Sequence, residues 1–332
     1  MKKNDIINLI FFIVVLALSA YLYFNRDITI SKKKFALDTL IEIKLTSSQN
    51  NLEEIIENGF EIIEYYERKL SYFNKNSFVW KLNTASKDSI KIDKDIYKLL
   101  DISTKLFHQT NSLYDVSIGK LTDIWNDTET IPEESRIENA IELVDFSQID
   151  YNNHFIRKPV EMKLNFGSLA KGFILDSLSN YFIKHDIKSG IINAGGDIKI
   201  FGQQKAIRIG IQHPRAKMGE IIATLKIKNK SVVTSGDYER YVEIDSLQYH
   251  HILNPKTGYP ARKSISVTVI AENALTADAY STAIFLSGPE KGIKLANSIE
   301  TLEVIIFYLD NKKIKYKKSD EMDKYLEKME GV

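Results

Sequence analysis

An uncharged apolar run near the N-terminus limits the possible folds of this chain more than any other feature. No charged residue occurs from Ile6 to Phe24, and a helix of roughly 20 apolar residues crosses the hydrocarbon core of a bilayer. Lys2 and Lys3 on the short flank favour a cytoplasmic N-terminus. The sequence therefore predicts a cytoplasmic flank at residues 1–5 and a transmembrane anchor at residues 6–24.

A cleaved signal peptide is the alternative interpretation, because Ala17-Leu18-Ser19 resembles a weak cleavage site. We favour the uncleaved anchor, since the apolar run continues past that site. The expected location is the inner (cytoplasmic) membrane, crossed once, with the remainder of the chain on the extracytoplasmic side.

Composition excludes several classes of protein. The chain has no cysteine, so disulfides, thiolate metal ligands, a cysteine nucleophile and a lipidated cysteine are all excluded. The formal net charge is +1, and acidic residues are interspersed among the lysines, so we expect no nucleic-acid partner. Anything that holds this chain to a membrane must therefore be peptide.

Beyond the anchor the chain divides into a predicted tether at residues 25–34, a catalytic region at 35–317 and a charged tail at 318–332. Apolar spacing predicts helices at 52–70, 95–108, 135–144 and 276–285, and strands in the second half of 35–45 and at 266–271 and 302–309. Helices and strands alternate without a regular βαβ repeat, which indicates an α+β fold with mixed sheets and packed helices. Whether two subdomains flank the site stays open.

Three segments suit ligand binding but are ambiguous by themselves. Tyr114-Asp115 could grip a heteroaromatic ring, although a turn-forming acid beside a core tyrosine explains it as well. Small residues around Lys171 lead into a helix whose N-terminus favours an anion, yet no Walker motif is present. A tight turn between two strands is enough to explain the sequence Gly195-Gly196-Asp197.

A fourth segment suggests a metal. Asp278, Ser281 and Thr282 lie at positions i, i+3 and i+4 of a predicted helix, so their oxygens share one face. Hard oxygen ligands of this kind suit Mg²⁺, whereas zinc would need a cluster of histidine or cysteine. Taken alone, Asp278 could equally be a surface acid of the helix.

Taken together, the motifs resemble the FAD:protein FMN transferase family, the ApbE-like flavin transferases. The resemblance covers residues 35–309 and rests on the order in which the motifs occur. They are Leu82-Asn83, Tyr114-Asp115 through Trp125, Ala170-Lys171-Gly172, Gly195-Gly196-Asp197, Thr234–Arg240, His251–Pro260 and Asp278–Thr282.

This resemblance implies Mg²⁺-dependent cleavage of FAD, transfer of FMN to a threonine hydroxyl of an acceptor protein, and release of AMP. It implies that Asp278, Ser281, Thr282 and the carbonyl of Ser168 bind the metal, and that His251 and Asp278 act in catalysis. The implied FAD contacts are Leu37, Phe73, Leu113, Tyr114, Asp115, Asn165, Lys171 and His251. The implied acceptor is a membrane-associated electron-transport subunit.

The chain departs from the family pattern in three ways. Leu37-Asp38-Thr39 stands where Met-Gly-Thr is common, Asn165 stands where an aspartate is usual, and no lipoprotein cysteine exists. Two other functions remain open from sequence. One is an Mg²⁺-dependent FAD pyrophosphatase that yields FMN and AMP, and the other is a non-catalytic flavin-binding protein on the membrane.

Overall fold

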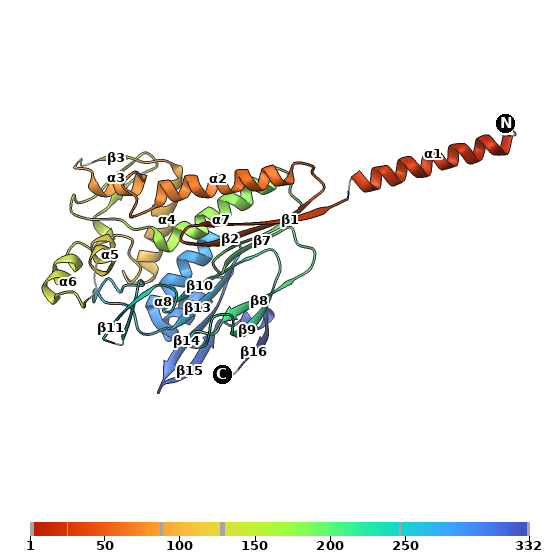
Figure 1. Cartoon of the computed structure of the whole chain (residues 1–332). Helices are drawn as coiled ribbons and strands as arrows, with labels where there is room; N and C mark the ends of the chain where they lie inside the picture. The colour runs from red at the N-terminus through yellow and green to blue at the C-terminus, as the bar shows by residue number, and fades with distance from the viewer. Residues whose placement is uncertain (1–2, 25, 87–88, 127–129, 246, 331–332) are drawn as a thin grey trace.

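The computed structural model describes residues 3–24, 26–86, 89–126, 130–245 and 247–330 (Figure 1). Helix α1 (Lys3–Phe24) projects from the body, and its large apolar side chains from Ile7 to Tyr23 are exposed. We predicted a transmembrane anchor here. Within the described ranges, however, no helix combines the length and the apolarity that a membrane span requires.

The body is built on one eight-stranded sheet in the order β1-β2-β6-β7-β10-β13-β14-β15. Its strands are β1 (Ile28–Ala36), β2 (Thr39–Ser47), β6 (Ser189–Ala194), β7 (Asp197–Phe201), β10 (Ser231–Gly236), β13 (Ser266–Ala271), β14 (Leu302–Asp310) and β15 (Lys313–Lys318). Every neighbouring pair in this sheet is antiparallel, where we had expected mixed sheets. The α+β class itself is confirmed, because helices pack on the sheet without parallel βαβ units.

Three long helices bring the site together: α2 (Leu52–Leu70), α7 (Gly167–Lys184) and α8 (Ala274–Asn297). Helix α7 packs against both α2 and α8, while α8 also contacts β10, β13 and β14. The amphipathic spacing of α2 buries Ile55, Ile56 and Ile63 against β2 and α7. Helix α8 runs past its predicted end at residue 285, with a kink at Gly288, where φ is 78°, before Pro289.

The other face of the sheet is covered by a second sheet, β16-β9-β8, made of β8 (Ile207–Gln212), β9 (Ile221–Ile227) and β16 (Leu326–Met329). Residues 318–332 were predicted as a charged tail, but β16 pairs with β9 and Met322 is fully buried. The last two residues of that range lie outside the described part. The apolar residues Met322, Tyr325, Leu326 and Met329 of this segment pack against the core, and charged residues occupy the positions between them.

Strand β1 is a second difference from the sequence analysis, which assigned residues 25–34 to a tether. Ile28–Ala36 pairs along its whole length with β2. Lys32 and Lys34 reach Glu57 and Glu64 of α2, so ion pairs occupy the inner positions where apolar side chains usually signal a strand. The polar composition therefore concealed an edge strand.

The remaining elements surround this framework. They are α3 (Phe78–Thr84), α4 (Lys94–Gln109), α5 (Gly119–Asn126), α6 (Glu134–Ile141), the small sheet β3 (Ile90–Lys91), β4 (Asp150–Tyr151) and β5 (Phe155–Arg157), and the hairpin β11 (Tyr241–Ile244) and β12 (Leu247–His250). The predicted helices at 52–70 and 95–108 and the strand at 266–271 agree with α2, α4 and β13.

Candidate active site

The site begins where α7 meets α8. The backbone N–H of Gly172 donates to Oδ2 of the buried Asp278 at 2.8 Å. A Cβ atom at position 172 would lie 2.3 Å from the carbonyl oxygen of Ala274. Only glycine allows the two helix backbones to approach so closely. The Ala-Lys-Gly motif is therefore a contact between helices as well as the source of Lys171.

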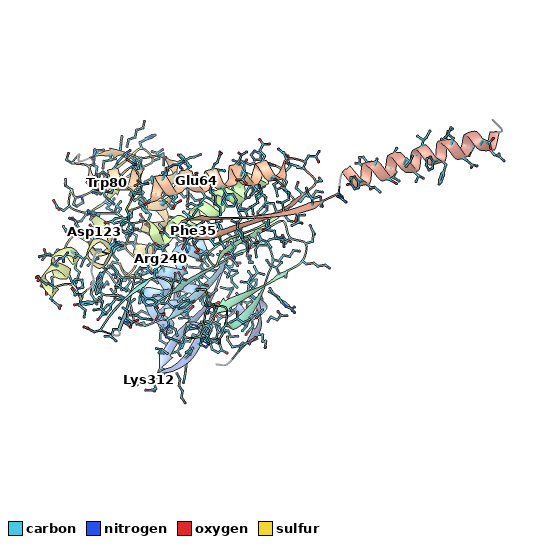
Figure 2. The ribbon with its side chains drawn as sticks, in the orientation of Figure 1. Phe35, Glu64, Trp80, Asp123, Arg240 and Lys312 are labelled. Carbon is cyan, nitrogen blue, oxygen red and sulfur yellow. The ribbon has the colours of Figure 1, made fainter. Side chains whose placement is uncertain are left out.

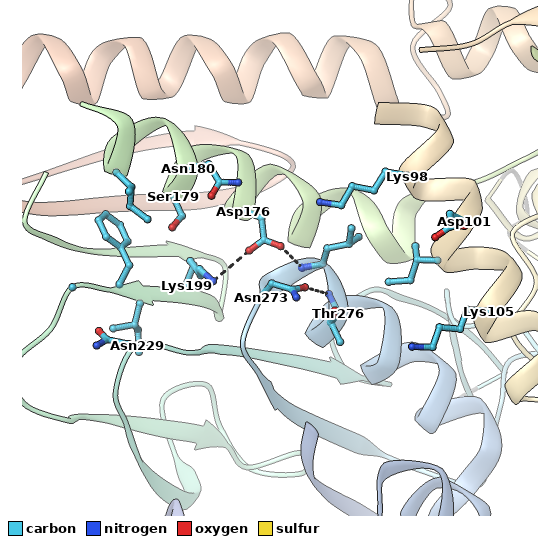
Figure 3. Close-up of a pocket in the computed structure, with 16 residues that line it drawn as sticks. Lys98, Asp101, Lys105, Asp176, Ser179, Asn180, Lys199, Asn229, Asn273 and Thr276 are labelled. Carbon is cyan, nitrogen blue, oxygen red and sulfur yellow. Dashed lines mark hydrogen bonds and ion pairs between the residues drawn. The ribbon is translucent and has the colours of Figure 1, made fainter. Parts of the chain in front are cut away.

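Asp176 fixes the start of α8 (Figure 3). Its carboxylate accepts hydrogen bonds from the N–H groups of Ala274 at 2.8 Å and Leu275 at 2.9 Å. The side chain of Asn273 caps the same helix by accepting from the N–H of Thr276. These acceptors satisfy N–H groups that have no partner inside a helix. They hold the first turn of α8, and with it Asp278, in place.

Three hydroxyl groups converge beside Asp278. The Oγ atoms of Ser235 and Ser281 lie 2.7 Å apart, and Ser235 Oγ is 3.3 Å from Oγ1 of Thr282. Ser281 donates to the carbonyl of Asp278, one turn earlier on α8. The side chains of Ser281 and Thr282 thus point to the same place, as their helical spacing predicts. Strand β10 contributes the hydroxyl of Ser235, which lies within the motif Thr234–Arg240 but was not predicted as a site residue.

Ser168 approaches the same region through a buried tyrosine. The hydroxyl of Tyr114 and Oγ of Ser168, in the first turn of α7, are 2.8 Å apart. Burial raises the pKa of Tyr114 well above its ordinary value, and the negative charges of Asp278 and Asp115 raise it further. Tyr114 is therefore a neutral hydroxyl that positions Ser168, close enough to Asp278 to sense its charge.

The electrostatics of the site are dominated by carboxylates. Lys171 forms an ion pair with the buried Asp197. Burial alone would lower the pKa of Lys171, but Asp197, Asp278 and Glu239 together raise it above its ordinary range. Burial, followed by the charge of Asp197, raises the pKa of Asp278. A carboxylate that is costly to ionise beside a second one is a group that a cation would stabilise.

Glu239 adds a third carboxylate at the mouth of the site. The residue is exposed to solvent. Protein nevertheless surrounds much of the carboxyl group, and this loss of hydration, with the charge of Asp197, raises its pKa to about 7. Neither Asp197 nor Glu239 was predicted as a site residue, although both lie within the motifs Gly195-Gly196-Asp197 and Thr234–Arg240.

The two adjacent histidines have different environments. His250 is buried, with Nε2 2.6 Å from the carbonyl of Ala261 and Nδ1 accepting from the N–H of Ile252. The side chain of His251 is exposed, and its Nδ1 lies 3.2 Å from the carbonyl oxygen of Arg240. Loss of hydration lowers the pKa of His251 to about 4. His251 is thus neutral at pH 7, with Nδ1 protonated and Nε2 available as an acceptor.

Leu37 lies in the tight turn between β1 and β2. Leu37 and Asp38 have φ values of 54° and 57°. This region costs a leucine roughly 1–2 kcal/mol, while aspartate tolerates it better. The N–H of Leu37 donates to Glu67 at 3.2 Å, and Arg240 approaches both the carbonyl of Leu37 and the carboxylate of Asp38 at 3.5 Å. Asp38 thus keeps the backbone conformation that the family's usual glycine adopts freely.

The other predicted FAD contacts differ in accessibility. Phe73 is 57% exposed and packs edge-on against Tyr72. Asp115 is buried, and both its oxygens accept hydrogen bonds, from Ser117 and from Phe146. Asn165 Oδ1 accepts from the N–H of Gly167 at 2.8 Å, just before α7. Leu113 is partly buried against the core.

Two predicted site residues therefore have direct contacts within the site: Lys171 forms an ion pair with Asp197, and Asp278 accepts a hydrogen bond from Gly172. Ser281 and Thr282 both contact the hydroxyl of Ser235. Asp115 instead accepts hydrogen bonds from Ser117 in its own loop and from the N–H of Phe146. A cavity of about 590 Å³ lies elsewhere, between α4, α7 and β7, and no predicted site residue lines it. Its polar lining includes Asp176, which accepts a hydrogen bond from the N–H of Leu275 at the start of α8 and forms an ion pair with Lys199 (Figure 3).

Comparison with known proteins agrees with this arrangement. The model of the ApbE family matches residues 37–306. An FAD:protein FMN transferase of Klebsiella pneumoniae is 30% identical over 262 residues, covering 76% of this chain and 82% of that protein. An FAD:protein FMN transferase of Buchnera aphidicola subsp. Schizaphis graminum is 30% identical over 286 residues, with 82% and 83% covered.

Solved structures show the same fold. The ApbE protein of Thermotoga maritima superposes with a TM-score of 0.82 at 29% identity, covering 91% of this chain and 100% of that one. The flavin transferase ApbE of Vibrio cholerae superposes with a TM-score of 0.80 at 19% identity, again covering 91% and 100%. Because the family model matches most of the sequence and the site motifs converge in space, the chain belongs to the ApbE family.

Proposed function

We propose that this chain transfers FMN from FAD to a threonine hydroxyl of an acceptor protein, with Mg²⁺ bound at the site. The main support is the cluster of side chains where α7, α8 and β10 meet. This cluster consists of Asp278, Ser281, Thr282 and Ser235, and the Lys171–Asp197 ion pair lies beside it. The relatives with 30% identity are FAD:protein FMN transferases, which supports the same reaction here.

The residues present fit a magnesium ion. One buried carboxylate, two hydroxyl groups and the Ser168 carbonyl are hard oxygen donors of the kind that Mg²⁺ prefers. Burial, and after it the charge of Asp197, raises the pKa of Asp278, so a cation bound beside the carboxylate would stabilise its ionised form. Asp278, Ser281, Thr282 and Ser168 would hold the ion, which supplies positive charge to the pyrophosphate of FAD when bound.

The chain's own groups would position the reactants. Lys171 offers a second positive charge for the phosphates. His251, neutral and with Nε2 free, would accept the proton of the attacking hydroxyl. In the transfer, the bond between threonine Oγ and the FMN phosphorus forms and the bond from that phosphorus to the bridging oxygen breaks. AMP departs with that oxygen.

One experiment separates transfer from hydrolysis. The full chain is incubated with FAD, Mg²⁺ and a flavin-acceptor domain, and the acceptor mass and the free AMP are measured. We expect the acceptor to gain one FMN for each AMP released. Release of AMP with free FMN and an unmodified acceptor would support a pyrophosphatase instead, and no AMP at all would refute both activities. Asp278→Ala should abolish turnover in Mg²⁺.

The membrane is the expected place of this reaction. Helix α1 exposes apolar side chains around its surface, and Lys2 and Lys3 precede them in the sequence. These features support attachment to the cytoplasmic membrane with the catalytic body outside. The acceptor that the family resemblance implies, an electron-transport subunit of that membrane, would lie at the same surface. Membrane fractionation and protease protection of intact cells test this. A soluble pool, or a catalytic body protected until lysis, would contradict it.

A further inference from the structure

The tip of the β1–β2 hairpin carries a small apolar surface beside the site. Phe35 and Leu40 are direct cross-strand partners, so their side chains lie together on one face of the sheet. Phe35 is 71% exposed and Leu40 is 54% exposed. Figure 2 labels Phe35 close to Arg240, whose guanidinium contacts the turn at Leu37. We call Phe35 and Leu40 the tip pair.

The rest of that face is polar. Lys33 and Glu42, the next outward pair along the hairpin, form a 3.4 Å ion pair, and Ser31 donates a hydrogen bond to Glu42. The inward lysines of β1 engage α2. The tip pair thus stands out as an exposed apolar pair on an otherwise polar face, at the end of the hairpin that borders the site. Such a concentration suits binding of another protein better than solvent exposure.

The position of the pair relates it to the site. Phe35 lies two residues before Leu37, or roughly 7 Å along an extended chain. The turn itself is held from two sides, by Glu67 and by Arg240, despite the left-handed conformation of Leu37. A strained turn that is fixed by its surroundings is typical of a functional site. The tip pair is therefore presented rigidly next to the predicted flavin contact.

Strand addition does not explain this surface. β1 is the outermost strand of the sheet, with β2 as its neighbour. Its consecutive residues Lys32, Lys33 and Lys34 carry charge along that edge, which opposes pairing with another strand. A partner would instead contact the side chains of the tip, from the face that Phe35 and Leu40 share.

We infer that the tip pair docks the acceptor protein, by contacting apolar residues that flank its target threonine. This inference rests on the proposed transfer to a protein, because such a reaction needs the acceptor to approach the flavin at the rim of the site. The exposed pair is continuous with that rim through Leu37 and Arg240. The pair would bind the acceptor without contacting FAD or the metal.

The chain offers a matched control. Hairpin β14–β15 also turns through two residues with positive φ, Asn311 and Lys312. Next to that turn, Leu309 is 48% exposed and pairs with Ile314. Figure 2 shows Lys312 at the far end of the body from Phe35. Leu309→Ser therefore removes an exposed leucine from a similar hairpin that does not border the site.

The test uses the full chain with Mg²⁺, FAD and an acceptor domain that the unmodified chain flavinylates. For the double variant Phe35→Ser/Leu40→Ser we expect KM for the acceptor to rise at least tenfold, which corresponds to about 1.4 kcal/mol. The kcat at saturating acceptor and the Kd for FAD should stay unchanged. Leu309→Ser should leave all three constants unaltered.

A direct readout comes from a photo-crosslinking amino acid placed at position 35 or 309. We expect a crosslink to the acceptor from position 35 only. An unchanged acceptor KM in the double variant, or equal crosslinking from both positions, would overturn the docking inference while leaving the proposed function intact. Absence of transfer by the unmodified chain, with every acceptor that carries a threonine in an apolar loop, would refute the proposed function and this inference with it.

Discussion

Gly172 and Asp278 are joined by a hydrogen bond of 2.8 Å, although 106 residues separate them in the sequence. This bond connects α7, which carries Lys171, to α8, which carries the predicted metal ligands. The same glycine leaves room for the carbonyl of Ala274. One backbone position therefore aligns Lys171, the predicted phosphate contact, with the predicted metal ligands on α8.

The variant Gly172→Ala tests this alignment. Its methyl group would clash with the Ala274 carbonyl, so the helices must move apart. We expect the free energy of unfolding to fall by about 1–3 kcal/mol, with loss of flavin transfer. Urea denaturation and an AMP-release assay measure the two effects. Ser177→Ala on the same helix should change neither, and a Gly172→Ala protein with ordinary stability and activity would refute the role of this contact.

Ser235 gives a second prediction. Ser235→Ala removes the hydroxyl that contacts both Ser281 and Thr282, leaving those groups less well oriented. We expect the apparent affinity for Mg²⁺ to fall about tenfold, with activity largely recovered at high Mg²⁺. Titration of activity with Mg²⁺ measures this.

Ser231 provides the control on the same strand. Its buried hydroxyl has no hydrogen-bond partner among the described residues. Ser231→Ala should therefore leave the Mg²⁺ affinity unchanged and should not destabilise the fold. Equal Mg²⁺ titrations for the Ser235 and Ser231 variants would contradict the assignment of Ser235 to the metal site.

The lowered pKa of His251 predicts an unusual pH dependence. With a pKa of about 4 instead of 6.5, the imidazole stays neutral well below pH 6. At saturating Mg²⁺, the fall in kcat that belongs to this histidine should therefore appear below about pH 5. In the unfolded chain the same group binds its proton near pH 6.5, so its contribution to stability is complete above 6.5 and declines as the pH falls toward 4.

The pH profile of kcat measures this property, with His251→Ala as the comparison. That variant should lose activity and retain its stability, because the side chain is exposed. His250→Ala should instead be destabilised, because it loses buried hydrogen bonds to Ala261 and Ile252. An acid limb of kcat centred near pH 6.5 would disprove the neutral assignment.

Asp176 tests the start of α8. Asp176→Ala leaves the N–H groups of Ala274 and Leu275 without their acceptor. We expect a loss of about 1–3 kcal/mol in the free energy of unfolding, together with weaker Mg²⁺ binding because Asp278 lies in the next turn. Thermal and urea unfolding check it. Asp101→Ala, an exposed acid that lines the same cavity, should stay within about 0.5 kcal/mol of the unmodified chain.

Sequence patterns correctly predicted the helices that have one buried face and the strands that are buried on both faces. Helix α2 and strand β13 agree with their predicted bounds, because apolar residues mark their buried faces without interruption. Strand β1 was missed because ion pairs to α2 replace its apolar face. The predicted helix at 276–285 ends shortly before Gly288, whose non-helical backbone interrupts α8, and a second helical segment continues from there to Asn297.

Spacing along the sequence predicted the site residues that share one helix, but it could not predict a residue that reaches the site from a different element. Asp278, Ser281 and Thr282 share a helix face, so periodicity revealed them. Ser235 reaches them from a strand 46 residues earlier than Ser281, and a lone serine in a strand gives no signal of that contact. Similarly, adjacent histidines look alike in sequence, and only the fold separates the buried His250 from the accessible His251.

The long separation between Gly172 and Asp278 also has a consequence during synthesis of the protein. A growing chain that ends before α8 contains Lys171 and Ser168 but neither the acceptor for the Gly172 N–H nor the predicted metal ligands Asp278, Ser281 and Thr282. The site therefore cannot assemble until most of the polypeptide has left the ribosome.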